Sequence, residues 1–197
     1  MSRLDAMDEE YAELVEQGKN LQALLLLEKT SLLRRETLGI DHPDVQRSLQ
    51  VLVMSYNGLS MAAVRSGGME VAWELLRKAE RLAGEKSLLR NKEVKSRLLA
   101  VTYNNLGCFY RARGSLHSAL KALDRALWIE MSCSEVDNPA ATHLNIAAVL
   151  SQLSKHRAAL EHIDCALQLL ERGDERFTWA LSLLLFLLVA FRPPACS

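Results

Sequence analysis

The sequence lacks an excess of charge of either sign. Its 24 Lys and Arg residues balance 24 Asp and Glu residues, so the formal net charge is zero. A neutral chain has no overall electrostatic attraction to nucleic acids or to anionic membranes. We therefore expect no nucleic-acid partner.

No secretory or transit segment is recognisable at the N-terminus, because the chain becomes acidic at Asp5 before any apolar run develops. The sequence also has few cysteines. The four residues are scattered, with no C-x-x-C pair and no spacing typical of zinc ligation. Reduced, structural thiols are therefore expected, and we predict a cytoplasmic protein.

Catalytic and cofactor-binding patterns are missing as well. The sequence has no H-E-x-x-H zinc motif and no phosphate-binding G-x-x-x-x-G-K-[ST] loop. His156 and His162 are six residues apart, which turns them to different faces of a helix. No cysteine has an obvious histidine partner for nucleophilic catalysis. We therefore predict that the chain is not an enzyme and holds no metal or cofactor.

The feature that determines the fold is internal repetition. Hydrophobic residues make up 49% of the 197 residues, which is enough for a substantial core. A shift of 40 residues superimposes Thr102 on Thr142 and Asn105 on Asn145, and apolar positions between these pairs also agree in class. The other identities at this shift are Ala119/Ala159, Leu120/Leu160, Asp124/Asp164, Ala126/Ala166 and Leu127/Leu167.

Further copies of the same unit lie upstream. At a shift of 47 residues, Tyr56 and Asn57 fall on Tyr103 and Asn104. A fainter fourth copy lies near the N-terminus, and its poorer fit suits a terminal unit that faces solvent on one side. Each copy has apolar residues at helical spacing, interrupted by a turn. The sequence therefore predicts an all-α solenoid of antiparallel helix pairs.

Small residues recur where the two helices of a pair should cross. Gly107 and Ala119 hold these places in one copy, and Ala147 and Ala159 hold them in the next. A glycine inside a helix costs up to about 1 kcal/mol, so it needs a packing reason. We predict that Gly107 and Ala147 are buried at close helix crossings.

At these residues the chain resembles the tetratricopeptide repeat family, whose pattern is an aromatic or apolar residue, Leu-Gly, Tyr, and then Ala, an apolar residue and Ala. The match covers residues 44–172. Residues 37–45 also resemble the linker and helix start of the longer-period repeats found in kinesin light chains. The resemblance implies a right-handed superhelix of stacked helix pairs, with a concave groove lined by the first helix of each pair.

The repeats divide residues 1–172 into units. One long first helix is expected from about residue 44 to residue 65, extended by two turns beyond the family norm. Pro43 suits the first turn of that helix, and Asp41 or His42 is its candidate cap. The expected units are an imperfect N-terminal helix pair 1–36 and repeats 44–84, 95–131 and 139–172.

Residues 173–197 break the repeat pattern. Residues 177–191 are nearly all apolar, but a helix of these fifteen residues would be roughly 22 Å long, short of the ~30 Å hydrocarbon core of a membrane. Three interpretations stay open: a helix packed on the last repeat, a short tail anchor, or an alternative or imperfect C-terminus. Membrane association is expected only if the tail is an anchor.

Amides recur at the groove positions that the resemblance implies, although Asn is a poor helix former. An Asn amide has donors and acceptors that can bind the backbone of an extended peptide. It could equally tie neighbouring helices together or be merely solvated. Asp8, Asn105 and Ala141 stand where co-chaperone repeats hold the Lys and Arg that clamp a C-terminal carboxylate, so a neutral groove is expected. The candidate partner-binding residues are Asn57, Asn104, Asn105, Cys108, Arg111, Asn145 and Ser151.

The predicted function is that of a scaffold or adaptor, which binds a peptide or helix of a partner protein in its concave groove. The alternative is a structural subunit of a larger cytoskeletal or ciliary assembly, packed permanently through its helix faces. A monomer in solution would favour the adaptor, and obligate association would favour the subunit. Either way, the expected partner is a protein or peptide.

Overall fold

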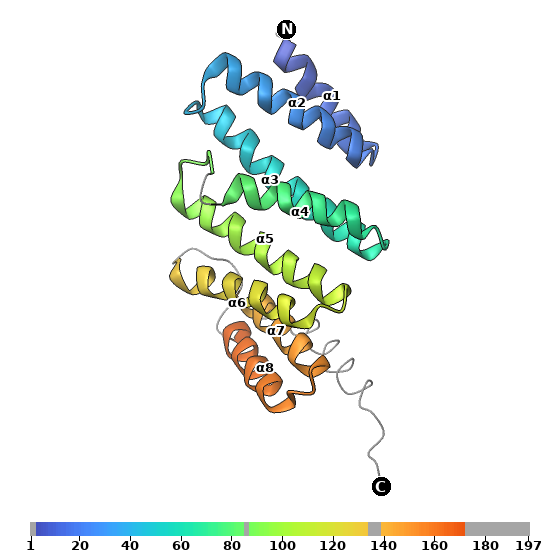
Figure 1. Ribbon diagram of the computed structural model, residues 1–197. Helices are drawn as coiled ribbons and strands as arrows, with labels where there is room; N and C mark the ends of the chain where they lie inside the picture. Colours follow the sequence, from blue (N-terminus) through green and yellow to red (C-terminus); the bar gives the residue numbers. More distant parts are fainter. Residues whose placement is uncertain (1–2, 85–86, 134–138, 172–197) are drawn as a thin grey trace.

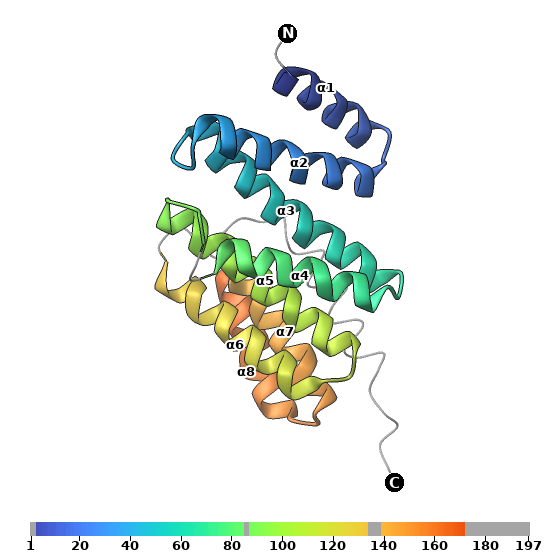
Figure 2. The same cartoon turned by 45° about the horizontal axis from the view of Figure 1, so that its top comes forward.

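The chain folds into a stack of antiparallel helix pairs (Figure 1). The computed structural model describes residues 3–84, 87–133 and 139–171, and within these ranges it has eight helices and no strand. Figure 2 shows the same order from a second direction, with α1 at one end of the stack. The helices are α1 Arg3–Glu16, α2 Asn20–Leu38, α3 Pro43–Arg65, α4 Met69–Ala83, α5 Lys92–Ala112, α6 Leu116–Ser132, α7 Pro139–Gln152 and α8 His156–Glu171.

The turn inside each pair has the same backbone geometry. Its central residue has a positive φ: 68° at Gly18, 82° at Gly67, 76° at Gly114 and 58° at Ser154. This residue donates its N–H to the carbonyl three residues back, and the next N–H reaches the carbonyl five residues back. Such a turn satisfies carbonyls that the end of the first helix leaves free. The N-terminal pair therefore turns in the same way as the clearer repeats.

Ser154 holds the place that glycine holds in the other three turns. A non-glycine residue in the left-handed region costs about 1–2 kcal/mol. We predict that Ser154→Gly raises the free energy of unfolding by up to about 1 kcal/mol, since the greater freedom of glycine in the unfolded chain offsets part of the gain. Denaturant unfolding measures the change. Gly114→Ser, at the matching turn, should destabilise the chain, and a Ser154→Gly variant less stable than the parent would contradict the argument.

The hydrophobic core repeats along the stack. One cluster of buried side chains lies mainly among α2, α3 and α4, a second among α4, α5 and α6, and a third among α6, α7 and α8. In the second cluster Phe109 is fully buried, and its ring stacks on Trp73 with the ring centres 5.5 Å apart. Because each cluster joins neighbouring helix pairs, each repeat depends on the next for stability.

Small residues lie at the helix crossings, as the sequence predicts. Ala119 and Ala147 are fully buried, and Gly107 is buried on α5. A Cβ atom added to Gly107 would lie only 2.4 Å from Cγ of Leu123 on α6. The two helices of this pair therefore approach too closely for any side chain at that position. The predicted burial of Gly107 and Ala147 is confirmed.

This close approach predicts opposite effects at two helical glycines. Gly107→Ala should lower the free energy of unfolding by about 1–3 kcal/mol, because the new methyl group overpacks against Leu123. Gly58→Ala is the matched control: nothing lies within 4 Å of an added Cβ there. It should raise stability by roughly 0.5–1 kcal/mol through helix propensity alone. Thermal and denaturant unfolding distinguish the two, and equal effects would show that the crossing is not tight.

The start of α3 is fixed by a cap and by a contact with the loop before α5. α3 is one continuous helix of 23 residues. His42 caps it, because His42 Nδ1 accepts the N–H of Asp44 at 3.2 Å, and Pro43 occupies the first turn. The other candidate cap, Asp41, instead accepts a hydrogen bond from Nε of Arg90 at 2.6 Å, in the loop before α5.

A polar contact joins the first two helix pairs. Glu28 on α2 accepts hydrogen bonds from the Tyr56 hydroxyl at 2.5 Å and from Nζ of Lys78 at 2.7 Å. Burial acts to raise the pKa of Glu28, but these bonds outweigh it and the pKa falls below its ordinary value. Lys78 Nζ also lies 5.5 Å from the centre of the Tyr56 ring, and the next pair repeats this with Arg125 over Tyr103 at 4.6 Å.

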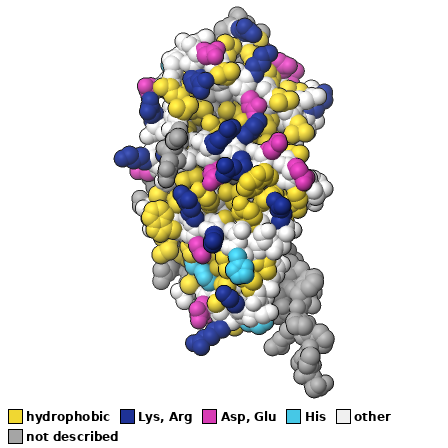
Figure 3. All heavy atoms as spheres, in the orientation of Figure 1, with side chains coloured by type: hydrophobic (Ala, Val, Ile, Leu, Met, Phe, Trp, Pro, Cys, Tyr) yellow, Lys and Arg dark blue, Asp and Glu magenta, His cyan; other side chains and the backbone are white. Residues whose placement is uncertain are grey.

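The surface mixes charge and apolar area. The face in Figure 3 carries basic, acidic and hydrophobic side chains side by side, and histidine side chains gather on its lower part. None of the described helices is both long enough and apolar enough to cross a membrane. Residues 173–197, with their three open interpretations, lie outside the described residues.

Candidate peptide-binding groove

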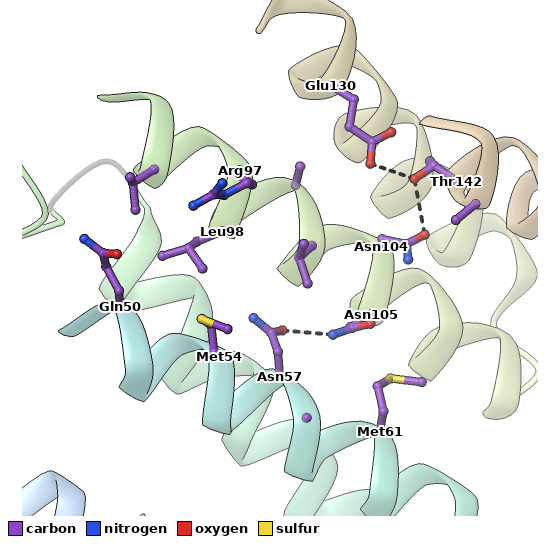
Figure 4. Close-up of a pocket in the computed structure, with 15 residues that line it drawn as sticks. Gln50, Met54, Asn57, Met61, Arg97, Leu98, Asn104, Asn105, Glu130 and Thr142 are labelled. Atoms are coloured by element: carbon purple, nitrogen blue, oxygen red, sulfur yellow. Dashed lines mark hydrogen bonds between the residues drawn. The ribbon is translucent and has the colours of Figure 1, made fainter. Parts of the chain in front are cut away.

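A groove lies along the first helices of three successive pairs. Its volume is about 690 Å³, and its walls come from α3, α5 and α7 with one residue of α6 (Figure 4). α5 packs against both α3 and α7, so the three helices form one continuous surface. The lining residues are Gln50, Met54, Asn57, Gly58, Met61, Val94, Arg97, Leu98, Ala100, Val101, Asn104, Asn105, Glu130, Ala141 and Thr142.

The groove includes some of the residues that the sequence singled out and not others. Asn57, Asn104 and Asn105 line it, and Asn145 lies beside it, hydrogen-bonded to Asn104. The remaining candidates do not line this groove and are half-buried elsewhere on α5 and α7: Cys108, Arg111 and Ser151.

Cys108 has the properties of a structural thiol. Burial raises the pKa of this thiol, and the nearby charge of Arg111 acts in the opposite direction without cancelling the effect. Thiolate is the nucleophilic form of cysteine, so a raised pKa makes Cys108 less reactive than an ordinary cysteine.

The asparagines bind one another across adjacent first helices. Asn105 donates from Nδ2 to Oδ1 of Asn57 at 3.1 Å (Figure 4), and Asn145 donates to Oδ1 of Asn104 at 2.9 Å. The shifts of 47 and 40 residues that relate the repeats superimpose acceptor on acceptor and donor on donor. We call these two bonds the asparagine ladder. Of the roles that the sequence left open for Asn, it shows the one in which amides tie neighbouring helices together.

The ladder is connected to the core on one side and reaches the groove on the other. Asn57 is buried and donates to Oγ1 of Thr102 at 3.0 Å, and Thr102 donates to the carbonyl of Leu98 at 2.8 Å. Asn105 and Asn145 are half-buried. Each ladder bond uses one of the two N–H donors of its amide, so these two side chains retain hydrogen-bonding capacity.

An apolar row runs beside the ladder. Met54, Val101 and Ala141 occupy the same register in three successive repeats. Met54 is 62% exposed and Val101 44% exposed, and Ala141 is exposed as well. The side chains shorten from Met to Val to Ala, which leaves more room toward α7. The sequence analysis missed this row, although the repeat shifts relate its members directly.

Two charged side chains of opposite sign also line the groove, so it is not lined by amides alone. Arg97 is exposed on α5, whereas Glu130 on α6 is only 9% exposed. Oε1 of Glu130 accepts the Thr142 hydroxyl at 2.9 Å, and Oε2 is buried without a partner in the described part of the chain. Burial raises the pKa of Glu130, and the bond from Thr142 offsets this only in part.

The raised pKa of Glu130 has a consequence for stability. The folded chain holds this proton more tightly than the unfolded chain, so the penalty of the buried charge is present at high pH and disappears as the pH falls. We predict that Glu130→Gln raises the free energy of unfolding by about 1–3 kcal/mol near pH 8. The gain should shrink as the pH falls from 8 toward 4.5, the ordinary pKa of a Glu carboxyl, because the folded parent takes up its proton on the way. Denaturant unfolding at both pH values measures it. The exposed Glu161→Gln is the control, and a gain independent of pH would contradict the assignment.

Two histidines that lie far apart in the sequence meet in the last pair. Nδ1 of His143 on α7 lies 2.9 Å from Nδ1 of His162 on α8, so one ring donates the hydrogen bond that the other accepts. Burial and the charge of His162 lower the pKa of His143. The sequence comparison of His156 with His162 missed this pair. Within the described ranges, no three His, Cys, Asp or Glu residues group as metal ligands would.

Comparisons with known proteins agree with this architecture. The sequence model of the tetratricopeptide repeat family matches residues 13–44 and 99–127. No curated protein matches the chain in sequence. The crystal structure of BtubC (BKLC) from P. vanneervenii is similar, with a TM-score of 0.54 and 19% identity over 98% of this chain and 67% of that chain. NprR in complex with its cognate peptide NprX has a TM-score of 0.56 and 20% identity over 98% of this chain and 63% of that chain.

The matched residues and the stacked helix pairs show that the chain carries tetratricopeptide-type repeats and has the fold of a helical-repeat solenoid. The predicted resemblance and the predicted all-α solenoid are confirmed. The chain spans about two thirds of the length of each similar structure. Repeats of this kind are protein-interaction elements, and their stacking creates extended binding surfaces.

Proposed function

We propose that the groove along α3, α5 and α7 holds a peptide segment of a partner protein, so that the chain is a scaffold or adaptor. The observation that supports this most directly is the exposed apolar row beside the half-buried amides of the ladder. Exposed apolar residues grouped in a concave site, with a few polar groups among them, are typical of ligand-binding surfaces. Met54 and Val101 would contact side chains of the peptide, while Asn105 and Asn145 would bind its backbone.

NprR supports the proposal at the level of the fold. That protein was crystallised with its cognate peptide, so a helical stack of similar shape can hold a peptide. At 20% identity the likeness does not identify which residues of this chain would take part. A cytoplasmic location, the lack of catalytic activity and the lack of nucleic-acid binding belong to the same proposal.

A structural subunit is the second candidate, and a separate surface favours it. Trp128 is 70% exposed and Met131 is 78% exposed, both on α6, outside the groove lining. Leu21 and Leu25 on α2 are exposed in the same way. A permanent neighbour in an assembly would cover such second-helix residues and leave the groove empty.

A charge placed in the groove distinguishes the two functions. Val101→Glu should weaken partner binding by about tenfold or more, because a carboxylate would have to be buried against the apolar part of the peptide. Quantitative pulldown from an extract of the source cells identifies the partner, and titration of the purified partner gives the Kd. Circular dichroism checks that the variant is folded.

Met131→Glu is the matched control, since it places the same charge on the exposed part of α6. It should bind the partner as the parent does. If Met131→Glu abolishes binding and Val101→Glu does not, the groove proposal is wrong and the subunit interpretation holds.

A further inference from the structure

Glu130 departs from the repeat at a position that is apolar in the neighbouring units. The 47-residue shift places Glu130 on Ala83, which is fully buried, and the 40-residue shift places it on Leu170. Packing alone therefore calls for an apolar residue here. A buried carboxyl group costs stability unless it is paired, so its presence needs another explanation.

Among the described residues, no counter-charge pairs with the carboxyl group of Glu130. Its hydrogen-bond partner is the neutral hydroxyl of Thr142, and its second oxygen has no partner among the described residues. Arg97 also lines the groove, but no ion pair joins it to Glu130. A cation that reached this carboxyl would relieve the cost of its burial.

The groove reaches Glu130 at this end, because Glu130, Ala141 and Thr142 all belong to its lining. Glu130 and Thr142 lie at the opposite end from Gln50 in Figure 4. Ala141 is the smallest member of the apolar row, and it directly precedes Thr142 in the chain. A long side chain could lie along Val101 and Ala141 and bring its head to the carboxyl. Lys and Arg have this construction, because their aliphatic stems cover apolar surface while their heads bind carboxylates.

We infer that this end of the groove, built from Glu130, Thr142 and Ala141, is a recognition pocket for a Lys or Arg side chain of the bound peptide. The inference rests on the proposed peptide-binding function and adds the chemistry of the partner to it. The rest of the groove would then contact apolar residues and the backbone, and Glu130 would determine which peptides fit.

Selection from a displayed library of random linear peptides tests this with the full-length chain. Peptides selected by the parent should share a Lys or Arg at a fixed distance from their apolar residues. Glu130→Gln keeps the shape of the side chain and removes its charge, so its selected peptides should lack that preference. Glu161→Gln, an exposed carboxyl on α8, should select as the parent does.

A double-mutant cycle then isolates the contact. Replacing the shared Lys of a selected peptide with norleucine should weaken binding to the parent by about tenfold to a hundredfold. The same replacement should change the affinity of Glu130→Gln by no more than about twofold. Acetylation of the peptide N-terminus should leave the affinity unchanged, which excludes the terminal amine as the source of the positive charge.

The outcomes separate this inference from the function on which it rests. If no peptide binds, or if Val101→Glu leaves the binding of selected peptides unchanged, both are wrong. If peptides bind in a Val101-dependent way but share no basic residue, the groove function stands and the recognition pocket is wrong. Equal loss from the norleucine replacement in the parent and in Glu130→Gln would likewise overturn the pocket.

Discussion

The two helices of a pair can pack as closely as α5 and α6 do only where one of them has no large side chain at the crossing. Leu123 occupies the space in which Gly107 would need a Cβ atom, and the buried alanines Ala119 and Ala147 hold equivalent crossing positions. This steric condition sets the position of each second helix against its first helix. Successive first helices, α3 with α5 and α5 with α7, contact one another on the side that faces away from their own second helices. The groove therefore lies between successive pairs, and its shape depends on the tight packing inside each pair.

Core packing and the groove lining use different faces of the same first helix. On α5, Leu106 and Phe109 point into the core, whereas Val101, Asn104 and Asn105 line the groove. Substitutions on the groove face should consequently have little effect on the core, so that under the proposed function they would change the partner alone. Glu130 is different, because it is a second-helix residue that reaches the groove from a core position. Under the proposed recognition role, this one side chain would link stability to binding.

The contacts that could be predicted from the sequence are those that repeat along the chain. Residues with the same role then recur at a constant shift, which the sequence shows directly. The helix pairs, the burial of Gly107 and the groove position of Asn57 belong to this kind. Glu130 could not be found in this way, since its register predicts an apolar residue like Ala83. The contact between His143 and His162 depends on how α7 crosses α8. The spacing of residues along a single helix gives no information on that crossing.

The asparagine ladder joins α3 to α5 and α5 to α7 along the groove. The rise from one repeat to the next is thereby tied to the geometry of two hydrogen bonds between asparagine side chains. A bound peptide must place its own contacts at the same interval, or it must displace a ladder bond and let the repeats move apart. Under the proposed function, the superhelical pitch of the array would therefore determine the length of peptide that the groove can hold. A change that alters the pitch at a distant turn would alter binding without touching the groove.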